Sequence, residues 1–148
     1  MILIMKLISK ATIQIQKPLE VVFEAIVDPE QMTNYFISES SGRLETGQEV
    51  VWKFPEFPEE IPITQIQVEE KRVITFVWDP ETRVRVDLEP KPDKSTVVRV
   101  TEVGKSVNAD NINWVVGNTE GWANFLACLK AWLEYEINLR KGAFDFMQ

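Results

Sequence analysis

The chain has 148 residues, 45% of them hydrophobic and 26% charged, which are ordinary values for a globular protein with one core. Its 16 lysines and arginines against 23 aspartates and glutamates give a net charge of −7, and such an acidic surface argues against nucleic-acid or membrane binding. The absence of histidine excludes catalytic triads and histidine metal sites, and the single cysteine excludes an intramolecular disulfide and fits a cytoplasmic location.

The N-terminal part predicts one strand followed by two short helices. Residues 11–16 alternate between apolar and polar, as in a half-buried strand, and we interpret the preceding MILIMKLISK as an extension of that strand rather than a signal peptide. The segment PLEVVFEAIV opens at Pro18 and carries apolar residues at helical spacing. Asp28 is placed to cap a second short helix that runs to about Phe36, so the two helices should form a bent pair.

Residues 40–104 predict only strands and turns, arranged as an antiparallel meander. A short strand is expected around Leu44, and residues 55–62, which are rich in proline and glutamate, are expected to form a loop. The apolar phase slips between Ile63 and Ile66, which predicts a β-bulge. The longer strands are expected within EVVWKF, IPITQIQVEE, VITFVW, TRVRVDLEPK and TVVRVTEV.

The C-terminal part predicts one long helix after a polar loop over residues 104–118. Thr119 is expected to cap this helix, which continues to about Lys141 and stops at Gly142. Because a curved sheet is the only other large element, the apolar stripe of the helix should face that sheet. The stripe consists of Trp122, Phe125, Leu126, Leu129, Trp132, Leu133 and Leu139.

Two charged residues, Glu136 and Arg140, fall within the same apolar arc of the predicted helix. The sequence favours an exposed ion pair at i, i+4, where the last turns of the helix leave the sheet. The alternative is that these charges form the polar end of a ligand cavity, where they would be partly desolvated.

Two stretches resemble the START-like superfamily, also called SRPBCC or birch-pollen-allergen-like. PLEVVFEAIVDPEQMTNYF looks like its opening helix pair. EGWANFLACLKAWLE resembles the signature of one branch, which is related to the C-terminal domain of the activator of the ninety-kilodalton heat-shock protein's ATPase. The resemblance implies one α+β domain over residues 1–148 with a helix-grip fold. In that fold a curved antiparallel sheet of about six or seven strands wraps a long C-terminal helix and often leaves a cavity.

The preferred function is binding of a hydrophobic or aromatic small molecule between the sheet and the last helix, without chemistry. The candidate ligand-binding residues are Trp52, Phe76, Trp78, Trp122, Phe125, Leu129, Trp132, Glu136 and Arg140. Each aromatic residue among them also has a simpler interpretation as plain core. Cys128 is expected to be a small buried hydrophobe, because no histidine is present to activate its thiol.

Two other functions remain open. A chaperone-binding module resembling the heat-shock-ATPase activators would use exposed aromatic residues such as Phe57 or Trp114, although Phe54 and Phe57 are expected to fold back on the protein. A cyclase- or hydrolase-like enzyme would need a cavity carboxylate or Tyr35 as its acid–base group. The family signature offers no catalytic residue, and no metal or cofactor is expected, since the chain contains no metal-ligand cluster or phosphate loop.

Overall fold

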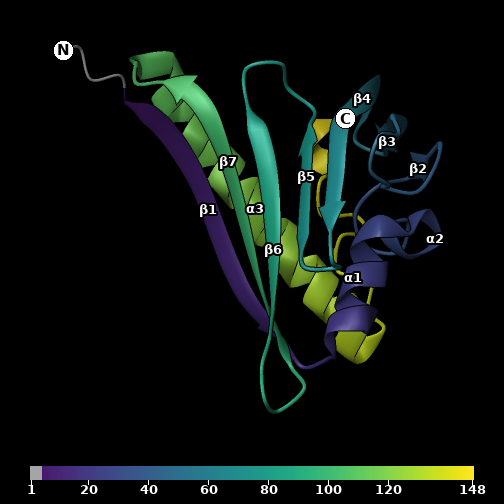
Figure 1. The fold of residues 1–148 in the computed structure, drawn as a ribbon. Coiled ribbons are helices and arrows are strands. Elements are labelled where there is room, and N and C mark those ends of the chain that lie inside the picture. The colour runs from purple at the N-terminus through teal and green to yellow at the C-terminus, as the bar shows by residue number, and fades with distance from the viewer. Residues whose placement is uncertain (1–4) are drawn as a thin grey trace.

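The computed structural model describes residues 5–148 and contains one antiparallel sheet and one long helix (Figure 1). Over those residues the sheet has seven strands, in the order β1-β7-β6-β5-β4-β3-β2. The strands are β1 Lys6–Ile15, β2 Glu39–Ser40, β3 Val50–Phe54, β4 Phe57–Glu69, β5 Val73–Val77, β6 Arg83–Pro90 and β7 Thr96–Ser106. The helices are α1 Leu19–Val27, α2 Pro29–Met32, α3 Ala109–Tyr135 and the 3₁₀ turn η1 Asp145–Met147.

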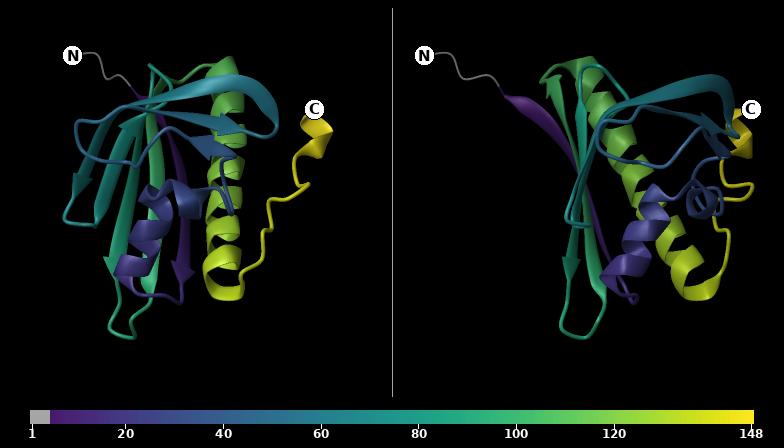
Figure 2. Two further views of the ribbon diagram at one scale, coloured as in Figure 1. Left: turned by 90° about the vertical axis from the view of Figure 1, so that its right-hand side faces the viewer. Right: turned by 45° about the vertical axis from the view of Figure 1, so that its right-hand side comes forward.

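The helix-grip prediction is confirmed. The sheet curves around α3, which crosses one of its faces and contacts β1, β7 and α1 (Figure 1). The helices α1 and α2 cover the same face of the sheet (Figure 2). The predicted extension of the first strand is confirmed from Lys6 onwards, whereas residues 1–4 lie outside the described part of the chain.

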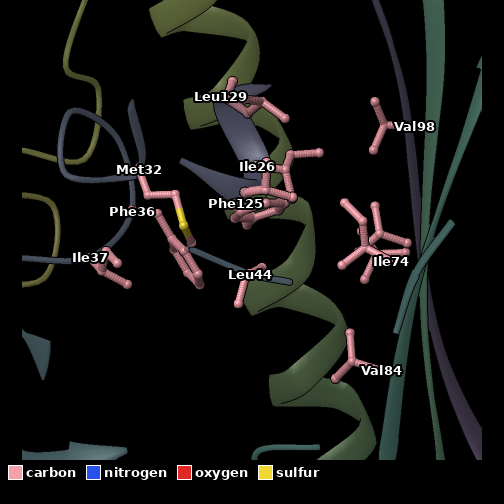
Figure 3. Packing of buried hydrophobic residues seen from close by; sticks show 14 of the residues in the cluster. Ile26, Met32, Phe36, Ile37, Leu44, Ile74, Val84, Val98, Phe125 and Leu129 are labelled. Carbon is pink, nitrogen blue, oxygen red and sulfur yellow. The ribbon is translucent and has the colours of Figure 1, made fainter. Parts of the chain in front are cut away.

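The core fills the space between the sheet and the helices. Figure 3 shows Ile74, Val84 and Val98 pointing from the sheet towards α3, and all three are fully buried. Phe125 and Leu129 of α3 meet them with at most 2% of their surface exposed. Buried positions recur every second residue in a strand, as at Val84, Val86 and Leu88 of β6, and Phe125 and Leu129 are four residues apart in the helix, so one face of each element is buried.

The start of α3 differs from the prediction. The helix begins at Ala109 rather than after Thr119, because Asn108 is its N-cap and accepts a hydrogen bond from the Asn111 N–H at 2.8 Å. The segment expected to be a polar loop is therefore the first two to three turns of the helix. The polar composition of this segment predicts a loop, but residues such as Asn118 lie in the helix and use their polar side chains to bind the sheet.

The end of α3 also differs from the prediction. Glu136 adopts a left-handed conformation with φ 54° and ψ 36°, and its N–H donates to the Trp132 carbonyl at 2.9 Å. The helix therefore ends at Tyr135 rather than near Lys141. Residues 136–148, here called the return segment, run back alongside α3 (Figure 2). Leu139 consequently leaves the predicted stripe and is exposed.

The sheet confirms one sequence prediction and corrects two. The register of β4 against β5 shifts between Thr64 and Gln67, as the predicted bulge requires. Leu44 is not in a strand, since its N–H donates to the Val27 carbonyl and its side chain is buried. Residues 55–62 do not form a loop: Pro55 and Glu56 make a tight turn, and β4 begins at once. The prolines fit because this end of β4 pairs only with β3.

The opening helix pair is present as predicted, with a shorter second member. Asp28 caps α2 by accepting a hydrogen bond from the Glu30 N–H at 2.9 Å, which confirms the predicted cap. The regular helix ends at Met32, and irregular turns carry the chain on to Phe36.

Candidate functional site

A cavity of about 410 Å³ lies among the β3–β4 end of the sheet, the first half of α3 and the return segment. This volume is within the range of roughly 300–1,000 Å³ that small-molecule sites occupy. Seven aromatic residues dominate its wall: Phe36, Phe54, Phe57, Trp78, Trp114, Trp122 and Phe144. They come from the turns after α2, from β3, β4, the residue after β5, α3 and the return segment, so the cavity exists only once all these elements are assembled.

Glu102 of β7 is a buried carboxylate in the cavity wall, with 1% of its surface exposed. Oε2 accepts from Trp78 Nε1 at 2.9 Å and from Thr82 Oγ1 at 2.6 Å. Oε1 accepts from Asn118 Nδ2 and Trp122 Nε1, both at 2.9 Å. Two carboxylate oxygens offer about four acceptor positions, and all four are occupied by neutral donors. Glu102 therefore fixes both indole rings at the cavity wall.

The same network attaches α3 to the sheet. Asn118 Nδ2 donates to Ser9 Oγ of β1 at 3.0 Å as well as to Glu102, so its amide hydrogens bind two strands. Ser9 and Glu102 are opposite each other in the β1–β7 ladder, and both are buried. A polar cluster of this kind is stable in the interior because each member has partners.

Glu56 and Arg140 form a second polar feature of the cavity. Arg140 donates from Nη2 at 2.8 Å and from Nε at 3.1 Å, both to Glu56 Oε1. Only 14% of the Arg140 side chain and 6% of the Glu56 side chain are exposed. The guanidinium also lies 4.6 Å from the centre of the Phe144 ring, within cation–π distance. The pair thus attaches the return segment to the β3–β4 turn.

The predicted pairing of Glu136 with Arg140 is wrong. Glu136 ends α3 and is exposed, whereas Arg140 lies beyond the helix and binds Glu56. The i, i+4 relation holds only within a helix, and the left-handed residue at 136 removes it.

We expect the Glu56–Arg140 pair to stabilise the fold measurably. Arg140→Met should lower the free energy of unfolding by about 3 kcal/mol, because it leaves a buried carboxylate without its counter-ion. Glu56→Gln should cost less, and the double variant should recover at least about 1 kcal/mol of the summed losses. Urea unfolding of the four proteins tests this. Glu136→Gln is the matched control and should change stability by less than about 0.5 kcal/mol; additive losses in the double variant would contradict the coupling.

The structure places the predicted ligand-binding residues in three groups. Trp78, Trp122 and Arg140 line the cavity. Trp52, Phe76, Phe125 and Leu129 lie in the packed core with at most 2% exposure and are not part of the cavity wall. Trp132 is half-buried against the core, and Glu136 is exposed at the helix end. The predicted set therefore combines a true cavity wall with core residues behind it.

Several residues of the cavity wall are absent from the predicted ligand-binding set. Phe54, Phe57 and Trp114 stood out as aromatic residues in polar segments, and they fold onto the cavity rather than outwards. Glu102 had a usable signal, because it follows Val98 and Val100 in the same strand phase and must therefore point inwards. Glu56 had no such signal, since its partner lies 84 residues away.

Two residues considered for chemistry are buried and engaged elsewhere. The Tyr35 hydroxyl donates to the Ala25 carbonyl at 2.8 Å, and burial raises the pKa of this phenol above its ordinary value. Cys128 is 4% exposed, as expected for a small buried hydrophobe. Burial raises the pKa of its thiol, an effect that outweighs the opposing influence of Arg140. Both groups are therefore held in their protonated forms at neutral pH.

Residues 5–148 contain no group of three or more histidine, cysteine, aspartate or glutamate side chains placed to hold a metal ion. Within the same range, every helix is too short or too polar to cross a bilayer.

Solved structures with the same fold are numerous. A protein from Staphylococcus saprophyticus is 32% identical, with a TM-score of 0.80, and the match covers 90% of this chain and 96% of that one. A Bacillus halodurans protein is 21% identical (TM-score 0.74; 87% and 99% covered). The Aha1 dimer from Colwellia psychrerythraea is 19% identical (TM-score 0.74; 87% and 97% covered). No protein with a curated description matches the chain.

The sequence profile described as "Activator of Hsp90 ATPase homolog 1-like protein" matches residues 16–134. The matched range includes both opening helices, the strands β2 to β7 and nearly all of α3, and it stops just before the return segment. This agrees with the START-like resemblance of the two helical stretches. The chain therefore belongs to the family of activator of Hsp90 ATPase homolog 1-like proteins.

Proposed function

We propose that the protein binds a hydrophobic or aromatic small molecule in the cavity between the sheet and α3, without chemical conversion. The observation that supports this most strongly is a cavity of about 410 Å³ whose wall carries seven aromatic side chains. An apolar ligand gains roughly 25 cal/mol for each Å² of apolar surface that it removes from water. Aromatic rings held at fixed angles also favour planar ligands through stacked or edge-on contacts.

The most deeply buried carboxylate of the cavity, Glu102, supports binding rather than catalysis. A general base needs a free lone pair within reach of the substrate. All acceptor positions of Glu102 are filled by Trp78, Thr82, Asn118 and Trp122. We therefore assign Glu102 the role of orienting the two indoles that a ligand would contact.

Gly121 of α3 provides the test. It lines the cavity, and a Cβ built on it would meet nothing within 4 Å. Gly121→Phe should therefore place a phenyl group in the cavity without displacing the backbone. We expect 2-naphthylmethanol to quench or shift the tryptophan emission of the wild-type protein in a saturable way. Gly121→Phe should weaken this binding at least about tenfold, equivalent to about 1.4 kcal/mol.

Two controls separate blocking from disturbance of the fold. Gly121→Ala adds only a methyl group and should keep binding while raising helix stability by up to about 1 kcal/mol. Ala123→Phe adds the same phenyl group at an exposed position on the opposite side of α3 and should also keep binding. Equal affinity in wild type and Gly121→Phe would contradict binding in this cavity.

Contact with a chaperone is the second candidate function, because the family's description names the Hsp90 ATPase. The return segment exposes apolar side chains, among them Ile137, Leu139 and Phe146, and the last is 82% exposed. Exposed apolar groups gathered in one segment are typical of protein contacts. Calorimetric titration with purified Hsp90 tests this candidate. Phe146→Ser should weaken the contact with Hsp90 and leave probe binding intact. Gly121→Phe should weaken probe binding and leave the contact with Hsp90 intact.

A further inference from the structure

The charges around the cavity do not balance. Its wall contains three carboxylates, Glu56, Asp79 and Glu102, and one cation, Arg140. Arg140 is paired with Glu56. Asp79 is paired with Lys105, whose Nζ lies 3.2 Å from Oδ2. Glu102 has only neutral hydrogen-bond donors, two indoles, a hydroxyl and an amide. The wall therefore carries one buried negative charge that has no protein cation bound to it.

Glu56 adds an unused acceptor. Both hydrogen bonds from Arg140 go to Oε1, and Oε2 has no hydrogen-bond partner although it is covered from solvent. Over residues 5–148, Glu56 Oε2 is the one buried side-chain oxygen that has no hydrogen-bond partner. A buried acceptor without a donor is unfavourable, and native structures rarely leave one empty without a reason. A ligand that brings a donor to this point satisfies it.

Arg140 is a poor site for an anionic ligand. Its Nε and Nη2 are already directed at Glu56, and its guanidinium lies against the rings of Phe36, Phe54 and Phe144. An anion would have only the remaining N–H groups of Arg140 to bind, and it would lie in a wall that also carries the carboxylates of Glu56 and Glu102. Like charges in a partly desolvated site repel strongly.

Building on the proposed function, we propose that the cavity takes an aromatic amine in its protonated form. The ring lies among the indoles of Trp78 and Trp122, and the ammonium N–H donates to Glu56 Oε2. Oε2 is covered by protein atoms, so the Glu56 side chain must rotate to bring it to the cavity when the ligand binds. Both oxygens move together in that rotation, and Arg140, which has five N–H donors, re-forms its bonds to the carboxylate. The positive charge offsets the net negative charge of the wall, which has three carboxylates against Arg140 and the Lys105 bound to Asp79, and the aromatic wall favours a cation further through its ring faces. The proposal thus specifies the charge of the ligand as well as its apolar character.

Three probes with one ring system test the charge preference. Calorimetric titrations at pH 7 compare 2-naphthylmethylamine, which is a cation, with neutral 2-naphthylmethanol and anionic 2-naphthoate. We expect the amine to bind about tenfold more tightly than the alcohol, because a charge-assisted hydrogen bond is roughly twice as strong as a neutral one. The carboxylate should bind most weakly.

Glu56→Gln tests the contact itself. It keeps the shape of the side chain and removes its charge, so the preference for the amine over the alcohol should fall to about threefold or less. Affinity for the alcohol should stay within about threefold of wild type, which also shows that the variant is folded. Glu89→Gln removes the same charge from an exposed pair with Arg99 outside the cavity wall and should keep the full preference.

The outcomes distinguish this inference from the proposed function. Tightest binding of the carboxylate, or equal binding of all three probes, overturns the amine preference and leaves an apolar binding cavity in place. An unchanged preference in Glu56→Gln overturns the role of Glu56. Failure of all three probes to bind the wild-type protein contradicts the proposed function, and the amine preference falls with it.

Discussion

Replacing Glu102 with leucine is expected to lower the free energy of unfolding by about 3–5 kcal/mol. The substitution removes the acceptor for four donors, Trp78 Nε1, Thr82 Oγ1, Asn118 Nδ2 and Trp122 Nε1. Donors left buried without an acceptor cost about 1–3 kcal/mol each, although losses within one network do not add fully. Urea unfolding followed by tryptophan emission measures the change. The same titration reports on the cavity, because two of the affected donors are indoles in its wall.

Glu102→Gln separates the hydrogen bonds from the charge. Its amide oxygen still accepts, but its NH₂ group faces donors that need an acceptor, so we expect a loss of about 2 kcal/mol. Glu89→Gln, at an exposed ion pair, should change stability by less than about 0.5 kcal/mol. A loss below about 1 kcal/mol for Glu102→Leu would mean that the network does not hold α3 to the sheet.

Gly104→Ala is expected to be the second severe substitution, with a loss of about 3 kcal/mol or more. Gly104 has φ +151°, and a Cβ there would lie 2.0 Å from the Glu81 carbonyl oxygen and 2.8 Å from Thr82 Cα. These contacts are with backbone, so the turn before β6 must move to relieve them. That turn carries Thr82, which donates to Glu102, and the damage therefore reaches the cavity wall.

Gly117→Ala is the matched control for this prediction. Gly117 lies in α3, and a Cβ there would meet nothing within 4 Å, so alanine should stabilise the protein by up to about 1 kcal/mol. Thermal unfolding followed by circular dichroism compares the two variants. Equal melting temperatures for Gly104→Ala and wild type would show that the turn accommodates the methyl group.

The fold could be predicted because its main signals are repeated over many residues. Alternation gave the strands, the slip between Ile63 and Ile66 gave the bulge, and the apolar stripe gave the last helix. The boundaries of that helix could not be predicted, because single residues decide them. Asn108 starts α3 through one side-chain hydrogen bond, and Glu136 ends it in a conformation that glycine usually occupies.

The aromatic part of the site could also be predicted, whereas its polar part could not. Trp78 is predicted from its place in the strand VITFVW, and Trp122 from its place in the apolar stripe of the helix. Glu102 lies two residues after Val100 in β7, so its inward orientation follows from the alternation of the strand only when that alternation is extended past the last valine. Glu56 pairs with Arg140 only in the folded chain. The predicted i, i+4 relation of Glu136 and Arg140 requires a helix that the chain does not form beyond Tyr135. Long-range polar pairs of this kind have no local pattern.

Tryptophan indole signals in ¹H–¹⁵N spectra test the central claim, that an apolar aromatic molecule binds in this cavity, most directly. The chain has five tryptophans, of which Trp78, Trp114 and Trp122 line the cavity and Trp132 lies away from it. Titration with 2-naphthylmethanol should move the indole signals of the first three in a saturable way and leave that of Trp132 in place. The absence of any shift in those three signals, or a saturable shift of Trp132 alone, would contradict the claim.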